Sequence, residues 1–450
     1  MRFAVNDNLE TPLSEEELLQ GGAVLLLLLD PHEWMHRRVE KVTFVDQHSL
    51  KRRVSVDLTL PGSDVIIIEK LPFVPVAFLD KRVLIDFDAR DEAGSSVPVL
   101  TKQENSRIAW AALARAAEHS LPGGLADLDE QTLQDLRMIV GGGPARALQA
   151  LERIERRASV HGEAAVALMK SWAFRSLAYD LATRFLLFLA IDDEPGARRV
   201  LKFSYVTPLQ EPTDLRSRLR RVASQFGWIP AEFDVAVPAI GEASSYHCEF
   251  APPAELEVVA SELMVETVDE IYVNQGDTAG PRAHVYIGQE VPTSEGWLTV
   301  WLRAPRTGLL RAAFVVTGVT LLLIVFFLDE KRITQIESNQ PVAILLTIPA
   351  LVSSFIVRPG EHGLATTLLT GIRLAVGLSG LSALAGAAFL VAQVSDGALL
   401  NSWRVLAAIA GICFLSCVVA FMGFGPVGRI GQARFPVTAL DEDEDNGEES

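Results

Sequence analysis

Two histidines and a glutamate near the start of the chain have a spacing that could bind a metal ion. His32, Glu33 and His36 lie in the sequence HEWMH at residues 32–36. On a helix, His32 and His36 would share one face, as two ligands of one zinc ion must, and Glu33 could act as a general base. These three residues are therefore the candidates for a metal site and a catalytic site.

The HEWMH sequence resembles the zinc site of zincin metalloproteases, but its surroundings differ from that family. A strand-like run begins by Arg38, so a helix that starts at Asp30 and Pro31 would have barely two turns. The downstream third-ligand motif of metzincins is absent. We therefore expect a turn in which the histidines and Trp34 pack near a sheet edge, with no metal or cofactor. A zinc-dependent, membrane-associated metalloprotease is kept as the second alternative function.

Other residue types that could do chemistry are more scattered. His247 and His284 lie on separate predicted strands and could meet in space, with Cys248 or Glu249 nearby. We expect them to be packed or solvated histidines. The glycines at residues 141–143 lack the Lys-Ser/Thr pair of a phosphate-binding loop and therefore predict the end of a helix.

The C-terminal third of the chain contains four long apolar segments. They cover residues 312–328, 341–357, 374–394 and 405–424. A helix of roughly 17 to 25 apolar residues spans the hydrocarbon of a bilayer. Pro349 in the second segment should kink its helix, because proline cannot donate a backbone hydrogen bond. We predict a C-terminal four-helix transmembrane bundle within residues 306–428.

The third apolar segment is rich in small residues, which allow helices to approach closely in lipid. They are Gly377, Gly380, Ala383, Gly386 and Ala387. Close packing is the expected role, and a pore lining is the alternative.

Arg373, Pro349 and Arg311 are the candidates for a role in the membrane or in gating. Arg373 is an ordinary flanking cation if the stretch 364–372 lies in the interface, and a buried functional residue if that stretch lies within the bilayer. Arg311 can lengthen the first span, because its charged end reaches the interface.

Basic residues near the spans predict the orientation, since Lys and Arg are retained on the cytoplasmic side. With the N-terminal part inside, seven arginines face the cytoplasm: Arg303, Arg306, Arg311, Arg358, Arg373, Arg429 and Arg434. Only Lys331, Arg332 and Arg404 then lie outside. We expect a multi-pass protein of the plasma membrane with both termini in the cytoplasm.

The preceding residues predict an α+β cytoplasmic domain that resembles a β-sandwich with a helical insertion. Residues 1–22 are polar and acidic and are expected to form a flexible arm. Period-two patterns predict a first β-rich half at residues 23–101 and a second at 196–305. Between them, helical periodicity over residues 102–195 predicts the insertion, whose fourth helix covers about 163–191.

A basic amphipathic segment interrupts the second β-rich half at residues 213–228. Leu215, Leu219, Val222 and Phe226 form an apolar stripe; Arg216 and Arg220 lie off it. Such a helix can lie on anionic headgroups, which makes these arginines candidates for membrane-surface binding. We expect an ordinary packed helix with its arginines in solvent, and membrane-surface binding is the alternative.

The composition excludes some classes of protein. The formal net charge of −17 argues against a nucleic-acid binder. Part of that charge lies in residues 429–450, which predict an acidic disordered tail. Three cysteines give no disulfide framework and suit a reducing compartment.

Two function classes fit this organisation better than an enzyme. The first is a membrane protein whose large cytoplasmic domain binds a ligand or protein, as a sensor or scaffold, with no evident catalytic site. The alternative is a gated pore or transport protein, for which the spans offer mainly hydroxyl groups. The expected partners are the lipid bilayer and either a second copy of the chain or another protein.

Overall fold

The protein is described by a computed structural model that covers residues 9–62, 65–68, 71–160, 162–209, 215–266, 271–275, 280–288, 294–328, 340–358, 362–392 and 396–423. The chain divides into two compact units. Unit 1 comprises Met1–Thr213, Glu232–Leu302 and Gly360–Thr367, and unit 2 comprises Asp214–Ala231, Arg303–Pro359 and Leu368–Ser450. The predicted acidic tail lies outside the described residues, as do Lys331, Arg332, Arg429 and Arg434.

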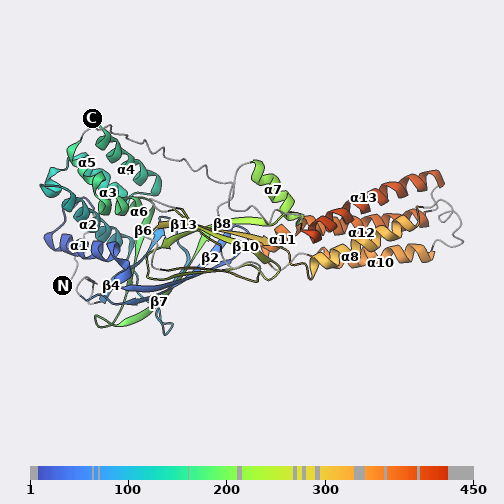
Figure 1. The fold of residues 1–450 in the computed structure, drawn as a ribbon, viewed down its shortest axis with the longest axis horizontal. Helices are drawn as coiled ribbons and strands as arrows, with labels where there is room; N and C mark the ends of the chain where they lie inside the picture. Colours follow the sequence, from blue (N-terminus) through green and yellow to red (C-terminus); the bar gives the residue numbers. More distant parts are fainter. Residues whose placement is uncertain are drawn as a thin grey trace, which may run out of the picture. The chain divides into compact units, whose positions relative to one another are not determined.

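Unit 1 mixes helices and strands, which confirms the α+β class (Figure 1). After α1 and η1, the strands β1–β5 precede the helices α2–α6, and strands return from β6 onward. Its elements are α1 (Glu15–Leu29), η1 (Pro31–Glu33), β1 (Met35–Phe44), β2 (Ser49–Thr59), β3 (Ile66–Ile68), β4 (Leu71–Asp80), β5 (Ile85–Arg90), α2 (Lys102–Ser120), η2 (Gly124–Asp127), α3 (Glu130–Gly141), α4 (Pro144–Ser159), α5 (Glu163–Lys170), α6 (Trp172–Thr183), β6 (Arg184–Ala190), β7 (Arg198–Pro208), β8 (Ala231–Ile240), β9 (Tyr246–Ala251), β10 (Glu257–Glu266), β11 (Ile271–Gln275), β12 (Ala283–Ile287) and β13 (Ser294–Arg303).

The strands of unit 1 form three sheets in the described part of the chain. The largest has the order β12-β9-β1-β2-β7-β5; the others have the orders β11-β10-β13-β8 and β3-β4-β6. In the largest sheet β1 pairs antiparallel with β2 and parallel with β9, so the two β-rich halves of the sequence share one sheet. The sandwich arrangement of these sheets stays a prediction.

Helix α1 shows that the expected flexible arm over residues 1–22 is wrong for its second part. A capping box starts this helix: Ser14 Oγ accepts the N–H of Glu17, and the Glu17 carboxylate accepts the N–H of Ser14. The helix packs so closely on α2 that a Cβ at Gly21 would overlap the backbone of Ala111. Gly21 is therefore required by the packing of α1 on α2.

The helical insertion also differs from the prediction in its last part. The single helix expected over about 163–191 is three elements: α5, α6 and the strand β6. Ser171 separates the two helices, because its Oγ accepts the N–H of Phe174 and caps α6. The run Phe185–Ala190 is extended because it pairs with β4. As predicted, α3 ends at the glycines of residues 141–143, and α4 begins at Pro144.

The described part of unit 2 contains apolar helices with a shared core of apolar side chains (Figure 1), and the four-helix transmembrane bundle stays a prediction. Three of them are long and apolar enough to cross a membrane: α8, α12 and α13. The fourth, α10, is also apolar but has 17 residues. The elements are α7 (Leu215–Gln225), α8 (Leu309–Phe326), α10 (Gln340–Ile356), α12 (Thr370–Val391) and α13 (Asp396–Met422), while α11 (Gly363–Leu368) belongs to unit 1 except for its last residue.

Small residues bring the helices of unit 2 together, as predicted for the third segment. A Cβ at Gly380 of α12 would come within 2.7 Å of Ser353 Cβ on α10. At the other end of α12, Gly386 lies against the ring of Trp403, whose Nε1 donates to Ile324 O at 2.8 Å. This buried hydrogen bond joins α13 to α8 across a core of apolar side chains.

Candidate functional site

The HEWMH residues do not form a helix. His32 and Glu33 lie in the short 3-10 helix η1, whereas His36 lies in β1. The ring Nε2 of His36 is 2.7 Å from Thr59 Oγ1 of unit 1. The two histidines therefore lack the shared helical face on which the zincin motif depends, and the described residues hold no cluster of three or more metal-binding side chains. The expected turn, with a buried Trp34, is confirmed.

His247 and His284 do meet in space, as predicted. Their strands β9 and β12 are neighbours, and the ring centroids lie 5.6 Å apart. Cys248 points to the buried side of the sheet, whereas Glu249 forms an ion pair with Lys41 at 3.1 Å. Their arrangement is that of packed histidines on the partly exposed face of a sheet.

The strongest candidate for a binding site is a cavity of about 230 Å³ in unit 1. It is enclosed by α1, β4 and α6, which contribute mainly apolar side chains such as Leu25, Phe78 and Leu177. Trp172 and Tyr179 line it as well and are exposed, so the cavity reaches the protein surface beside α6.

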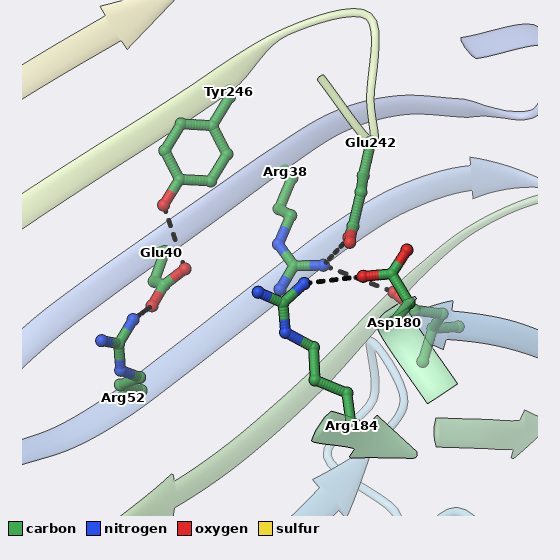
Figure 2. A network of polar contacts seen from close by, with 8 residues as sticks. Arg38, Glu40, Arg52, Asp180, Arg184, Glu242 and Tyr246 are labelled. Carbon is green, nitrogen blue, oxygen red and sulfur yellow. Dashed lines mark hydrogen bonds and ion pairs between the residues drawn. The ribbon is translucent and has the colours of Figure 1, made fainter. Parts of the chain in front are cut away.

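One wall of the cavity is ionic. It is formed by Asp180, Arg184 and Glu242, which come from α6, β6 and the loop after β8. Arg184 Nη1 lies 3.0 Å from Asp180 Oδ1. Glu242 Oε2 in turn accepts a hydrogen bond from Arg38 Nη1 at 2.8 Å (Figure 2).

The ionic wall continues into the largest sheet through charged side chains of β1 and β2. Arg38 Nη1 also donates to Val76 O of β4 at 3.4 Å. Two residues further along β1, Glu40 forms a buried ion pair with Arg52 of β2 and accepts the hydroxyl of Tyr246 at 3.0 Å (Figure 2). Arg38, Glu40 and Arg52 are all buried, so these partners compensate for the loss of water.

The pKa values of these groups follow from burial and from their partners. Burial lowers the pKa of Arg38, but the carboxylates of Glu242 and Glu40 outweigh it, and the pKa is raised. Burial raises the pKa of Glu40, but Arg52 and Arg38 outweigh it, and the pKa is lowered. For Glu242, burial dominates over the attraction of Arg38, so its pKa is raised. Of the two carboxyl groups, Glu242 takes up a proton more readily.

This arrangement suits the binding of a small amphipathic molecule. A dry cavity of roughly 150 Å³ holds benzene, so this one has room for on the order of ten non-hydrogen atoms. The apolar walls would contact the body of such a ligand, and the carboxyl and guanidinium groups would orient its polar end. The described lining includes Ser176 but no histidine or cysteine that could activate it.

None of the charged residues of this wall was identified as a site residue from the sequence, and Arg38 and Glu40 behind the wall were not singled out either. A signal was present, because Arg38 and Glu40 have the same period-two phase as the apolar Val42 and Phe44 in β1. Side chains in one phase of a strand share a face, and all four are buried here. A charged residue in the phase of a hydrophobic face predicts a buried polar contact, although its partner cannot be read from the strand.

The residues of unit 2 that were candidates for a role in the membrane, in gating or at the membrane surface lie on different helices. Arg373 lies in the first turn of α12 and is buried, whereas Arg311 lies in the first turns of α8 and is exposed. Pro349 is inside α10 and is buried. Arg220 is exposed on α7; the side chain of Arg216 lies outside the described part. The structure does not gather these residues into one site.

The fold defines the class of the chain as a mixed α+β protein, and three helices in its described part could span a membrane. No protein-family model matches the chain. No curated protein matches it either. The geometry of the cavity and the chemistry of unit 2 therefore carry the functional proposal.

Proposed function

We propose that the chain is a multi-pass membrane protein whose unit 1 is a cytoplasmic sensor domain for a small amphipathic ligand. The observation that carries this proposal is the cavity between α1, β4 and α6, with apolar walls and one ionic wall. Buried ion pairs contribute little to stability compared with apolar packing, so the buried pair between Arg38 and the lining residue Glu242 is consistent with a role in recognition.

The membrane part of the proposal places all four apolar helices of unit 2 in the bilayer, including the shorter α10. Their exposed surfaces are rich in large apolar side chains, such as Leu322, Ile344, Leu381 and Ile412, which suits contact with lipid. The described hydroxyls Thr317, Thr320, Thr347 and Ser382 donate to carbonyls of their own helices. These four contacts support a packed anchor.

The orientation follows from the end of unit 2 at which the cations lie. Arg306, near the start of α8, donates from Nη2 to Met422 O at the end of α13, at 3.1 Å. Arg373 begins α12 and Arg358 follows α10, so they belong to the same end of the antiparallel helices. The positive-inside rule places this end, unit 1 and both termini in the cytoplasm. In the same proposal, a second copy or another protein binds the chain and receives its signal.

Ligand binding is tested on the full chain in detergent, with benzoate, benzylamine and benzyl alcohol as probes of the cavity. We expect at least one of them to raise the thermal midpoint of unit 1. Ser176→Phe fills the cavity and should abolish the shift, whereas Arg175→Phe changes an exposed residue of α6 outside the lining and should preserve it. A shift that survives Ser176→Phe, or no shift with any of the three probes, would contradict a ligand cavity of this kind.

Orientation is tested with reporters that are active on only one side of the membrane. Fusions after Ala23, within residues 333–338, within 395–400 and after Ser450 distinguish the possible topologies. Cytoplasmic signals from both ends and external signals from the two inner positions support the proposal. A signal from outside at Ala23 would overturn the cytoplasmic assignment of unit 1.

A further inference from the structure

Helix α7 belongs to unit 2 although the rest of unit 2 begins about 70 residues later in the chain. Phe226, directly after α7, lies so close to Gly371 of α12 that an added Cβ would come within 2.7 Å of its ring. Trp228 Nε1 donates to Ser416 Oγ on α13 at 3.1 Å. These contacts hold α7 at the end of unit 2 where α12 begins and α13 ends (Figure 1).

The surface of α7 combines cationic and large apolar side chains. Arg218, Arg220 and Arg221 are exposed; Leu219 is 66% and Val222 50% exposed. The predicted apolar stripe is thus divided, because Phe226 packs on α12 while Leu219 and Val222 face outward. The helix sequence LRSRLRRVASQ contains no acidic residue. A cationic surface with outward apolar side chains fits an anionic membrane interface.

The position of α7 along the apolar helices fits the level of the lipid headgroups. Helix α13 has 27 residues, which corresponds to about 40 Å, whereas the hydrocarbon core is about 30 Å thick. The excess length lies at the start of α13, where Asn401 and Arg404 precede the apolar run, whereas Ser416, the partner of Trp228, lies within its last two turns. Tryptophan is enriched at membrane interfaces, and Arg306 marks the same end of unit 2.

We propose that α7 lies flat on the anionic leaflet into which its own chain is inserted. The arginines bind phosphate groups of anionic phospholipids, and Leu219 and Val222 enter the boundary between headgroups and acyl chains. This inference rests on the proposed membrane insertion of unit 2. It adds a lipid partner and makes the position of α7 depend on lipid charge and ionic strength.

The test places one nitroxide label at a time on the full chain, in a background whose three cysteines are replaced by alanine. The sites are Leu219→Cys on α7, Leu322→Cys on α8, which is 67% exposed, and Val83→Cys in unit 1, which is 85% exposed. The protein is reconstituted in phosphatidylcholine alone or mixed with phosphatidylglycerol. Collisions with oxygen report lipid exposure, and collisions with a nickel chelate report water exposure.

We expect the Leu219 label to be oxygen-accessible in the anionic bilayer and to become water-accessible in phosphatidylcholine alone. Arg218→Gln with Arg220→Gln should weaken the membrane-bound position by about 30-fold, since each basic residue near an anionic surface contributes about 1 kcal/mol. Arg218→Lys with Arg220→Lys should preserve it, because the charge is kept.

The two reference labels separate the possible failures. If Leu322 is as water-accessible as Val83, the proposed membrane insertion is wrong. If Leu322 is in lipid while Leu219 remains in water in anionic bilayers, insertion stands and the inference about α7 is overturned. A Leu219 label that is in lipid regardless of lipid charge, or is unaffected by the two glutamines, would also overturn the electrostatic part of the inference.

Discussion

Arg38 Nη1 and Glu242 Oε2 lie 2.8 Å apart and are both buried, although 204 residues separate them in the chain. The pair joins the first β-rich half of unit 1 to the second, and Glu242 also lines the cavity. Glu242 therefore both connects the two halves of unit 1 and is a candidate for ligand recognition.

The two members of this pair should respond differently to removal. Glu242→Leu leaves the Arg38 charge buried without this partner and should lower the free energy of unfolding by about 3–5 kcal/mol. Arg38→Met should cost less, because Glu242, whose pKa is already raised by burial, can become neutral by taking up a proton. Chemical unfolding of the full chain in detergent, with the double variant completing a cycle, measures both effects. Equal losses for the two single variants would contradict the predicted asymmetry.

The buried thiol of Cys248 should make the folded protein less stable at alkaline pH. Burial raises the pKa of its thiol from 9.0 to about 12, so between these values the unfolded chain releases a proton that the folded chain keeps. The unfolded state then binds fewer protons at this residue, and the contribution of Cys248 to stability falls by up to about 1.4 kcal/mol per pH unit as the pH rises. Burial also raises the pKa of Tyr205, from 10.0 to about 12, so that residue contributes only above pH 10.

The comparison of wild type with Cys248→Ala between pH 9 and pH 10 isolates the thiol. We expect the alanine variant to lose less stability across this interval, as measured by the unfolding midpoint of unit 1. Parallel pH profiles for the two proteins would show that Cys248 does not titrate as expected.

Two glycines of α12 provide a matched pair for the contact with α7. A Cβ at Gly371 would meet the Phe226 ring at 2.7 Å and the backbone of Gln225 at 2.8 Å, whereas a Cβ at Gly377 would meet Val357 Cγ2 at 3.5 Å. Gly371→Ala should therefore displace α7 and cost about 1–3 kcal/mol, while Gly377→Ala should cost little. Hydrogen exchange of residues 215–228 measures the effect. Equal protection in the two variants would contradict the close packing of Phe226 on α12.

The sequence by itself determined the apolar helices of unit 2 and the α+β class of unit 1. Both follow from local patterns: long apolar runs must form internally bonded helices in lipid, and periods of two and 3.6 distinguish strands from helices. Helix ends signalled by Gly143 and Pro144 were likewise visible. The HEWMH residues do not form a helix, because β1 begins at Met35 and pairing in the sheet decides the conformation of His36.

Only the tertiary structure decided the cavity and its ionic wall. Its charged residues come from α6, β6 and the loop after β8, and Arg38 comes from β1; no spacing in the sequence relates these segments. The same holds for α7, whose amphipathic pattern was visible but whose attachment to α12 was not. Local periodicity specifies which face of an element is apolar, whereas the choice of partner depends on packing between residues far apart in the chain.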